Sequence, residues 1–178
     1  MALAGPSAPT SASQTPVTGT VAWGTPSNIE TSGASYATLL VNATSIASEN
    51  LMGEGFGFSI PSGATINGIV VSIAIVNTPL SSYCGLDSVQ LLKAGAVAGT
   101  AKTGTFTSTQ SFGSSSDLWG TTWTPAQINA AGFGVAVTGG GTNYYGSVTV
   151  QTNAWLVTVY YTPAGSGAIA SVSGLFGF

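Results

Sequence analysis

The residues of this chain that could carry out acid, base or nucleophilic chemistry are few. The sequence has no histidine, which removes the Ser-His-Asp and Cys-His nucleophile systems and the commonest metal ligand. A glycosidase would need two carboxyl groups that converge on one cleft. The candidates are five carboxylates whose sequence spacing pairs no two of them: Glu30, Glu49, Glu54, Asp87 and Asp117. We therefore predict that the protein is not an enzyme and has no catalytic residue.

The same scarcity bears on metals and cofactors. Asp117, in the run SSSDLW, could join main-chain carbonyls around a calcium ion, but such sites need roughly six to eight oxygen ligands and the Asp-x-Asp-x-Asp-Gly array is missing. A turn-capping role for Asp117 is the simpler interpretation. Cys84 is the only cysteine, so it has no internal disulfide partner and is expected to be a small packed side chain. We predict no metal and no cofactor.

The charge content excludes some classes of partner. Only 4% of the residues are charged, against about 25% in an ordinary soluble domain. Lys93 and Lys102, without any arginine, cannot neutralise a run of phosphates, so no nucleic-acid partner is expected. The longest strongly apolar run, IVVSIAIV, is much shorter than the roughly 18 residues of a membrane span. With a net charge of only -3, copies repel each other weakly, and we expect a homo-oligomer, with a trimer favoured.

Aromatic side chains in predicted loops are the remaining candidates for binding. Tyr144 and Tyr145 lie in the run GGGTNYYG, and Tyr83 and Trp23 are also flanked by turn-forming residues. Exposed aromatic rings on a β-sandwich could stack on sugars, although single loop aromatics are more often packing or interface groups. A glycan partner is therefore kept as an alternative.

The elements that must position these residues are short β-rich runs separated by Gly, Pro, Asn and Ser. This pattern predicts an all-β fold, an antiparallel β-sandwich of jelly-roll-like type. The predicted strands cover residues 19–23, 36–41, 44–48, 55–60, 66–76, 87–92, 96–102, 105–110, 133–137, 147–151 and 154–161. Residues 69–76 and 154–161 have apolar side chains on both faces, which indicates central strands.

One helix is predicted near residues 125–131. Thr124 can cap it, Pro125 suits its first position, Gln127 can complete a capping box, and Gly132 can end it. Trp119 and Trp123 come just before this helix. We predict that both are structural and plug one end of the sandwich, each placing its indole N–H on a main-chain carbonyl.

The ends of the chain differ in composition from its middle. Residues 1–16 are mostly Ala, Ser, Thr and Pro and are predicted to form an extended N-terminal arm outside a sandwich domain of residues 17–163. Residues 164–178 combine small residues with large apolar ones. We expect this tail to dock on a neighbouring subunit or on a capsid surface through Ile169, Leu175, Phe176 and Phe178.

Five stretches in order, VAWGTPSNIETSGASYATLLV, FGFSIPSGATINGIVVSIAI, SVQLLKAGAVAG, GSSSDLWGTTWTPAQINAAGFGVAV and WLVTVYYTP, carry a family resemblance. From about Val21 to Pro163 the chain resembles a β-sandwich domain that recurs in tailed-bacteriophage virion proteins and phage-derived genes. The strand after GATI is usually charged in such domains, whereas NGIVVSIAIVN here has no charge. That departure indicates an outer strand face that is buried or meets a close neighbour.

The resemblance implies a part of the virion, which agrees with the uncharged composition. The leading hypothesis is a capsid decoration or cement protein on the outer surface of the particle, with the major capsid protein or other virion proteins as partners. One alternative is a head-fibre or tail-fibre adhesion module that binds a host-surface glycan or receptor. A second alternative is a structural component of the tail or neck.

Overall fold

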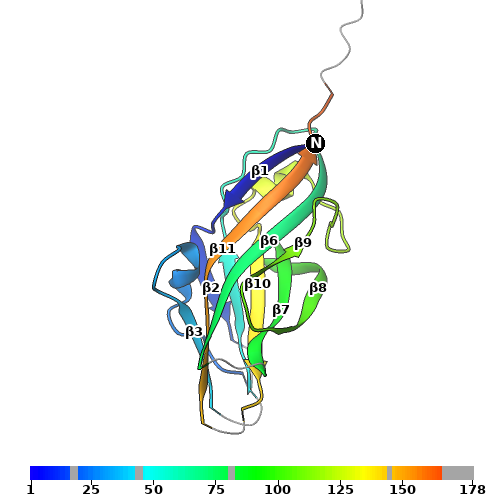
Figure 1. The fold of residues 1–178 in the computed structure, drawn as a ribbon. Coiled ribbons are helices and arrows are strands. Elements are labelled where there is room, and N and C mark those ends of the chain that lie inside the picture. The colour runs from blue at the N-terminus through cyan, green and yellow to red at the C-terminus, as the bar shows by residue number, and fades with distance from the viewer. Residues whose placement is uncertain (17–19, 43–45, 80–82, 144–145, 166–178) are drawn as a thin grey trace, which may run out of the picture.

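Two antiparallel sheets packed face to face form the molecule (Figure 1). The computed structural model describes residues 1–16, 20–42, 46–79, 83–143 and 146–165. Sheet A has five strands in the order β1-β11-β6-β9, with β3 also paired to β11. Sheet B has six, in the order β2-β5-β10-β7-β8, with β4 also paired to β10. The predicted all-β, jelly-roll-like antiparallel sandwich is confirmed.

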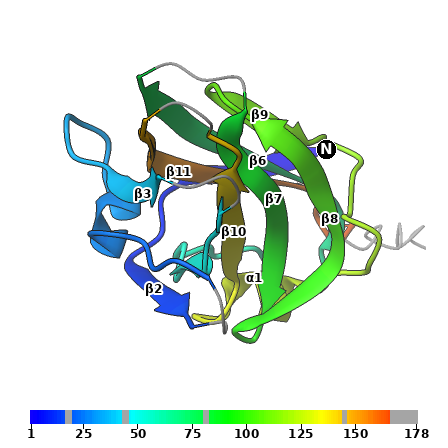
Figure 2. The same ribbon diagram turned by 90° about the horizontal axis from the view of Figure 1, so that it is seen from below.

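The two sheets draw their strands from the whole length of the chain. Sheet A consists of β1 (Ala2–Ser7), β3 (Ala37–Val41), β6 (Thr65–Thr78), β9 (Gln110–Gly113) and β11 (Val148–Thr162). Sheet B consists of β2 (Ser11–Thr15), β4 (Ile46–Ala47), β5 (Asn50–Glu54), β7 (Cys84–Lys93), β8 (Ala96–Phe106) and β10 (Gly134–Gly141). A 3-10 helix, η1 (Pro26–Glu30), and a short helix, α1 (Pro125–Asn129), complete the fold. Figure 2 shows the same strands from below.

The core lies between the sheets and is built by alternation along the strands. In β6, Ile69, Val71, Ile73 and Ile75 are buried, and in β11, Trp155, Val157 and Val159 are fully buried. Side chains of successive strand residues point to opposite faces, so Val70, Val76, Leu156 and their neighbours lie on the outer face of sheet A. The central position of both strands is confirmed, since β6 lies between β11 and β9 and β11 lies between β6 and the pair β1 and β3.

The prediction that residues 1–16 form an extended arm outside the sandwich is wrong. Residues 2–7 form β1, which pairs with β11 from Ala2 opposite Tyr161 to Ser7 opposite Val157. Residues 11–15 form β2, which pairs with β5. The segment therefore changes from sheet A to sheet B within four residues and closes one side of the sandwich (Figure 1). Main-chain hydrogen bonds order it, which its small side chains gave no reason to expect.

Residues 55–60 are also different from the prediction, because they form no strand. Gly55 and Gly57 have positive φ values of 73° and 67°, which interrupt the extended backbone. The side chain of Asn129 takes the place of a strand partner, accepting from the Ile60 N–H at 2.9 Å and donating to its carbonyl oxygen at 2.8 Å. The apolar residues of this segment still reach the core, where Phe56 and Phe58 stack at 6.2 Å.

The predicted N-cap of the helix is confirmed, and the helix itself is shorter than predicted. The Gln127 N–H donates to Thr124 Oγ1 at 3.3 Å, and Gln127 Oε1 accepts from the Thr124 N–H at 3.0 Å, which is a complete capping box. The helix ends at Asn129, before the expected Gly132, because Ala130 already has extended dihedral angles. Its single buried residue, Ile128, anchors it to the core.

Candidate functional site

Asp117 has the turn-capping role expected from the sequence. Its Oδ1 accepts a hydrogen bond from the Trp119 main-chain N–H at 2.7 Å, and its Oδ2 lies 2.6 Å from Lys102 Nζ. The hydrogen bond from Lys102 is the main reason that the pKa of Asp117 lies below its ordinary value. Lys102 also lies 5.2 Å from the centre of the Trp119 ring. Asp117 therefore holds the loop that places Trp119 in the core.

Asp87 differs from Asp117 because burial dominates its environment. Partial burial raises the pKa of Asp87 above its ordinary value, and no neighbouring cation contributes to that shift. One isolated carboxyl group with a raised pKa is not the acid and base pair that a glycosidase needs. Among the described residues, no group of three His, Cys, Asp or Glu side chains could hold a metal ion.

Both tryptophans before the helix are structural, as predicted. Trp119 is fully buried, and its indole N–H donates to the Ile69 carbonyl oxygen at 3.0 Å. Trp123 is almost fully buried, donates to the Leu118 carbonyl oxygen at 3.1 Å and packs edge-on against Phe133. Cys84 is likewise buried, with its Sγ 3.7 Å from the Thr142 carbonyl oxygen. These side chains belong to the core.

Of the four loop aromatics, the structure describes Trp23 and Tyr83. Trp23 is only 3% exposed, its indole N–H donates to the Glu49 carbonyl oxygen, and the prediction that it is a contact residue is wrong. The chain next to Trp23 is held by two main-chain hydrogen bonds between Gly24 and Thr38, one donated by each residue. Residue propensities do not predict such a pairing between distant segments. Tyr83 is 70% exposed at the start of β7, and its carbonyl oxygen accepts from the Thr142 N–H. Tyr144 and Tyr145 lie outside the described residues.

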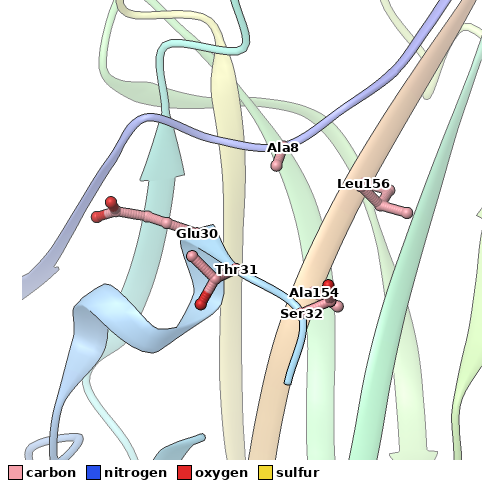
Figure 3. Close-up of a pocket in the computed structure, with 6 residues that line it drawn as sticks. All are labelled: Ala8, Glu30, Thr31, Ser32, Ala154 and Leu156. Atoms are coloured by element: carbon pink, nitrogen blue, oxygen red, sulfur yellow. The ribbon is translucent and has the colours of Figure 1, made fainter. Parts of the chain in front are cut away.

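A pocket of about 470 Å³ opens at the edge of β11, where that strand changes its edge partner (Figure 3). On the N-terminal side of the pocket, β11 pairs with β3 up to Thr152. On the C-terminal side, β11 pairs with β1 from Val157. In the gap, the Ala154 N–H donates to the Thr31 carbonyl oxygen at 3.0 Å, and Ala154 has a positive φ of 47°. The pocket is lined by Ala8, Glu30, Thr31, Ser32, Ala154 and Leu156. It offers one carboxylate and no aromatic ring.

The most unusual surface is the outer face of sheet A. In the part of the chain that the structure describes, the strands of this sheet contain no Asp, Glu, Lys or Arg, and the charged residues lie in sheet B, in η1 or in loops. The apolar side chains on this face are Leu3, Leu40, Val70, Val76, Leu156 and Tyr160, and small residues between them include Ser72, Ala74 and Thr158. We call this set the uncharged face.

Pairing brings the members of the uncharged face together. Leu3 of β1 lies opposite Tyr160 of β11, Thr158 lies opposite Val70, and Leu156 lies opposite Ser72. Leu3 is 57% exposed, Leu40 is 48% exposed and Val76 is 38% exposed. The sequence indicated the uncharged β6 segment, but Leu3 was missed because β1 was not recognised as a strand, and Leu40 was missed although residues 36–41 were predicted to form one. The apolar side chains of this face therefore come from four strands, and the exposed ones among them come from β1, β3 and β6.

The tail predicted to act as an anchor, with Ile169, Leu175, Phe176 and Phe178, lies outside the described residues. Neither of the two described helices has the length and hydropathy to span a membrane. No family model matches the chain, and no curated protein matches it. A solved structure described as "CBM4 structure and function" matches with a TM-score of 0.36 and 13% sequence identity, over 68% of this chain and 82% of the other. The fold of this chain is an antiparallel β-sandwich, and that match adds nothing on its activity.

Proposed function

We propose that this chain is a structural protein on the outer surface of a bacteriophage particle, of the capsid decoration or cement type. The resemblance of residues 21–163 to a phage virion domain suggests the setting. The observation that carries the proposal is the uncharged face, because large apolar side chains in an uncharged surface are typical of protein contacts. The partners would be the major capsid protein, other virion proteins and further copies of this chain.

The mechanism is the burial of surface across subunit boundaries. Apolar surface removed from water contributes about 25 cal/mol per Å², and an uncharged surface avoids the cost of stripping water from ions. The particle would be stabilised because separating its subunits exposes this surface again. Such an interaction depends weakly on salt, since no ion pairs need to form.

The proposal is tested on particles of the phage whose genome encodes this chain. Quantitative mass spectrometry of purified particles measures the copy number relative to the major capsid protein, with a tail protein of known copy number as the internal control. A cement protein is expected in a fixed ratio to the capsid subunits. Absence from washed particles would contradict the proposal, and a few dozen copies or fewer would favour a fibre, tail or neck component instead.

Adhesion to a glycan or receptor is a second candidate, favoured by the exposure of Tyr83. Tyr83 is 70% exposed, and its carbonyl oxygen accepts from the N–H of Thr142, which precedes Tyr144 and Tyr145 in the sequence. Glycan-array binding that is lost in Tyr83→Ala and kept in Tyr160→Ala would support adhesion. No binding by the wild-type protein at micromolar concentration would contradict it.

A further inference from the structure

We infer that the uncharged face is a two-fold interface between two copies of this chain. The inference rests on the proposed function, since it names the surface through which an assembly protein would associate with itself. It replaces the trimer expected from composition with a pair related by a two-fold axis. The charge, the area and the side-chain sizes of the face support this pairing.

Charge is the first argument. In a two-fold contact both partners use the same surface, so a residue near the axis faces its own copy. Any charged side chain there would meet a like charge in a desolvated position, which is unfavourable. The strands of sheet A carry no charged residue, whereas the described strands of sheet B contain Glu54, Asp87, Lys93 and Lys102. Of the two outer faces, only that of sheet A meets the requirement of self-pairing.

Area is the second argument. Residues 70–78 of β6, whose outer face lies beyond the loop after β9, span roughly 30 Å at about 3.3 Å per residue. The neighbouring strand β11 extends further in both directions. Strands about 4.8 Å apart make the sheet roughly 15 to 20 Å wide, so each copy offers roughly 450 to 600 Å². Two copies would then bury about 900 to 1,200 Å², which reaches the lower end of the size range of specific interfaces.

Texture is the third argument. Ser72, Ala74 and Thr158 are small side chains on this face, and Val76, Leu156 and Tyr160 are larger ones, with Leu156 directly opposite Ser72. Asn153, opposite Ala74, is covered by the loop before β3, because its Nδ2 donates to the carbonyl oxygens of Gly33 and Ser35. Two twisted sheets pack face to face at about 10 Å with their strands roughly 30° apart when side chains of each fit between those of the other. Large groups from one copy can fit over the small groups of the other. The loop after β9 limits this surface at one end, because Ser114 and Ser115 lie against Gly68.

The test is sedimentation equilibrium of the full chain over a range of concentrations. Wild-type protein is expected to be a dimer at micromolar concentration, and Val70→Lys should raise its dissociation constant by at least about 30-fold, because two ammonium groups would be buried near the axis. Val97→Lys is the matched control, since Val97 is 54% exposed on edge strand β8 of sheet B and should leave the dimer unchanged. Circular dichroism melting checks that each variant folds.

A milder variant keeps the test valid if Val70→Lys does not fold. Val76→Thr keeps the side-chain shape at a position already 38% exposed, and it should weaken the dimer several-fold with little change in melting. A wild-type monomer, a trimer, or equal effects of Val97→Lys and Val70→Lys would overturn the inference. Loss of the dimer on deletion of residues 166–178 would also overturn the inference, since the tail would then make the contact between the copies. Absence of the protein from particles would contradict the proposed function and leave the dimer standing.

Discussion

The indole N–H of Trp119 donates a hydrogen bond to the main-chain oxygen of Ile69 at 3.0 Å, and this bond joins the loop after β9 to the inner face of sheet A. Trp119 is fully buried, and its main-chain oxygen accepts from the Thr100 N–H of β8, so the loop links the edges of the two sheets. We predict that Trp119→Ala lowers the free energy of unfolding by about 3 to 5 kcal/mol. Urea denaturation measures it, with Val97→Ala as a surface control expected to change by less than about 0.5 kcal/mol. A change below about 1 kcal/mol in Trp119→Ala would contradict a core role.

The capping box gives a second prediction. Thr124→Ala and Gln127→Ala each remove one of the two reciprocal hydrogen bonds at the start of α1. Thr124→Ala should cost about 1 kcal/mol of folding free energy, and the double variant should cost less than the sum of the single ones, because the two bonds form one unit. Additive effects in a double-mutant cycle would show that the two bonds act independently.

The Lys102–Asp117 pair makes stability depend on pH at the acid end. The folded-state pKa of Asp117 is below its ordinary value of 3.8, so its ionised form stabilises the folded protein. This contribution is present above the ordinary pKa and is lost as pH falls through the folded-state pKa. Asp117→Asn should therefore be less stable than wild type at pH 7, and the difference should shrink below about pH 4. A difference that stays constant from pH 7 to pH 2 would show that the carboxylate charge is not involved.

Asp87 should behave in the opposite way. Burial raises its folded-state pKa above 3.8, so the ionised carboxyl group destabilises the folded protein. The folded state is favoured below the ordinary pKa, and that advantage is lost as pH rises through the folded-state pKa. Asp87→Asn should raise the melting temperature at pH 7 and have little effect near pH 3. Equal melting temperatures at pH 7, or a lower one for the variant, would mean that the charge of Asp87 has a compensating partner.

Deleting residues 166–178 should leave the sandwich folded, because β11, the last strand among the described residues, ends at Thr162. We predict a melting temperature unchanged within a few degrees and weaker attachment to the particle, since the tail carries Leu175, Phe176 and Phe178. Thermal melting and a particle-binding assay, compared with a Leu175→Ser, Phe176→Ser double variant, separate the two effects. A truncated chain that no longer folds would place the tail in the domain's own core and contradict anchoring.

Local sequence signals predicted those parts of the fold that depend on local chemistry. Thr124, Pro125 and Gln127 specify the start of α1, and the period-2 pattern specifies β6 and β11. Residues 55–60 have strand-like composition, but Gly55 and Gly57 have positive φ values, and Ile60 bonds to the side chain of Asn129 instead of to a neighbouring strand.

Strand pairing between distant segments could not be predicted in the same way. Neither β1 nor β2 has a strong pattern of its own, because both are edge strands whose order comes from main-chain bonds to β11 and β5, far away in the sequence. The uncharged face was therefore predicted only in its β6 part. Trp23 was misplaced for a related reason, since its burial depends on long-range contacts with Gly139 and Glu49.

An image reconstruction of the intact phage particle, at a resolution that places side chains, tests the central claim most directly. We expect density for this sandwich on the outer surface of the particle, with Val70, Leu156 and the rest of the uncharged face covered by another protein subunit. Particles that lack this density, or that carry the protein with the uncharged face open to solvent, would contradict it.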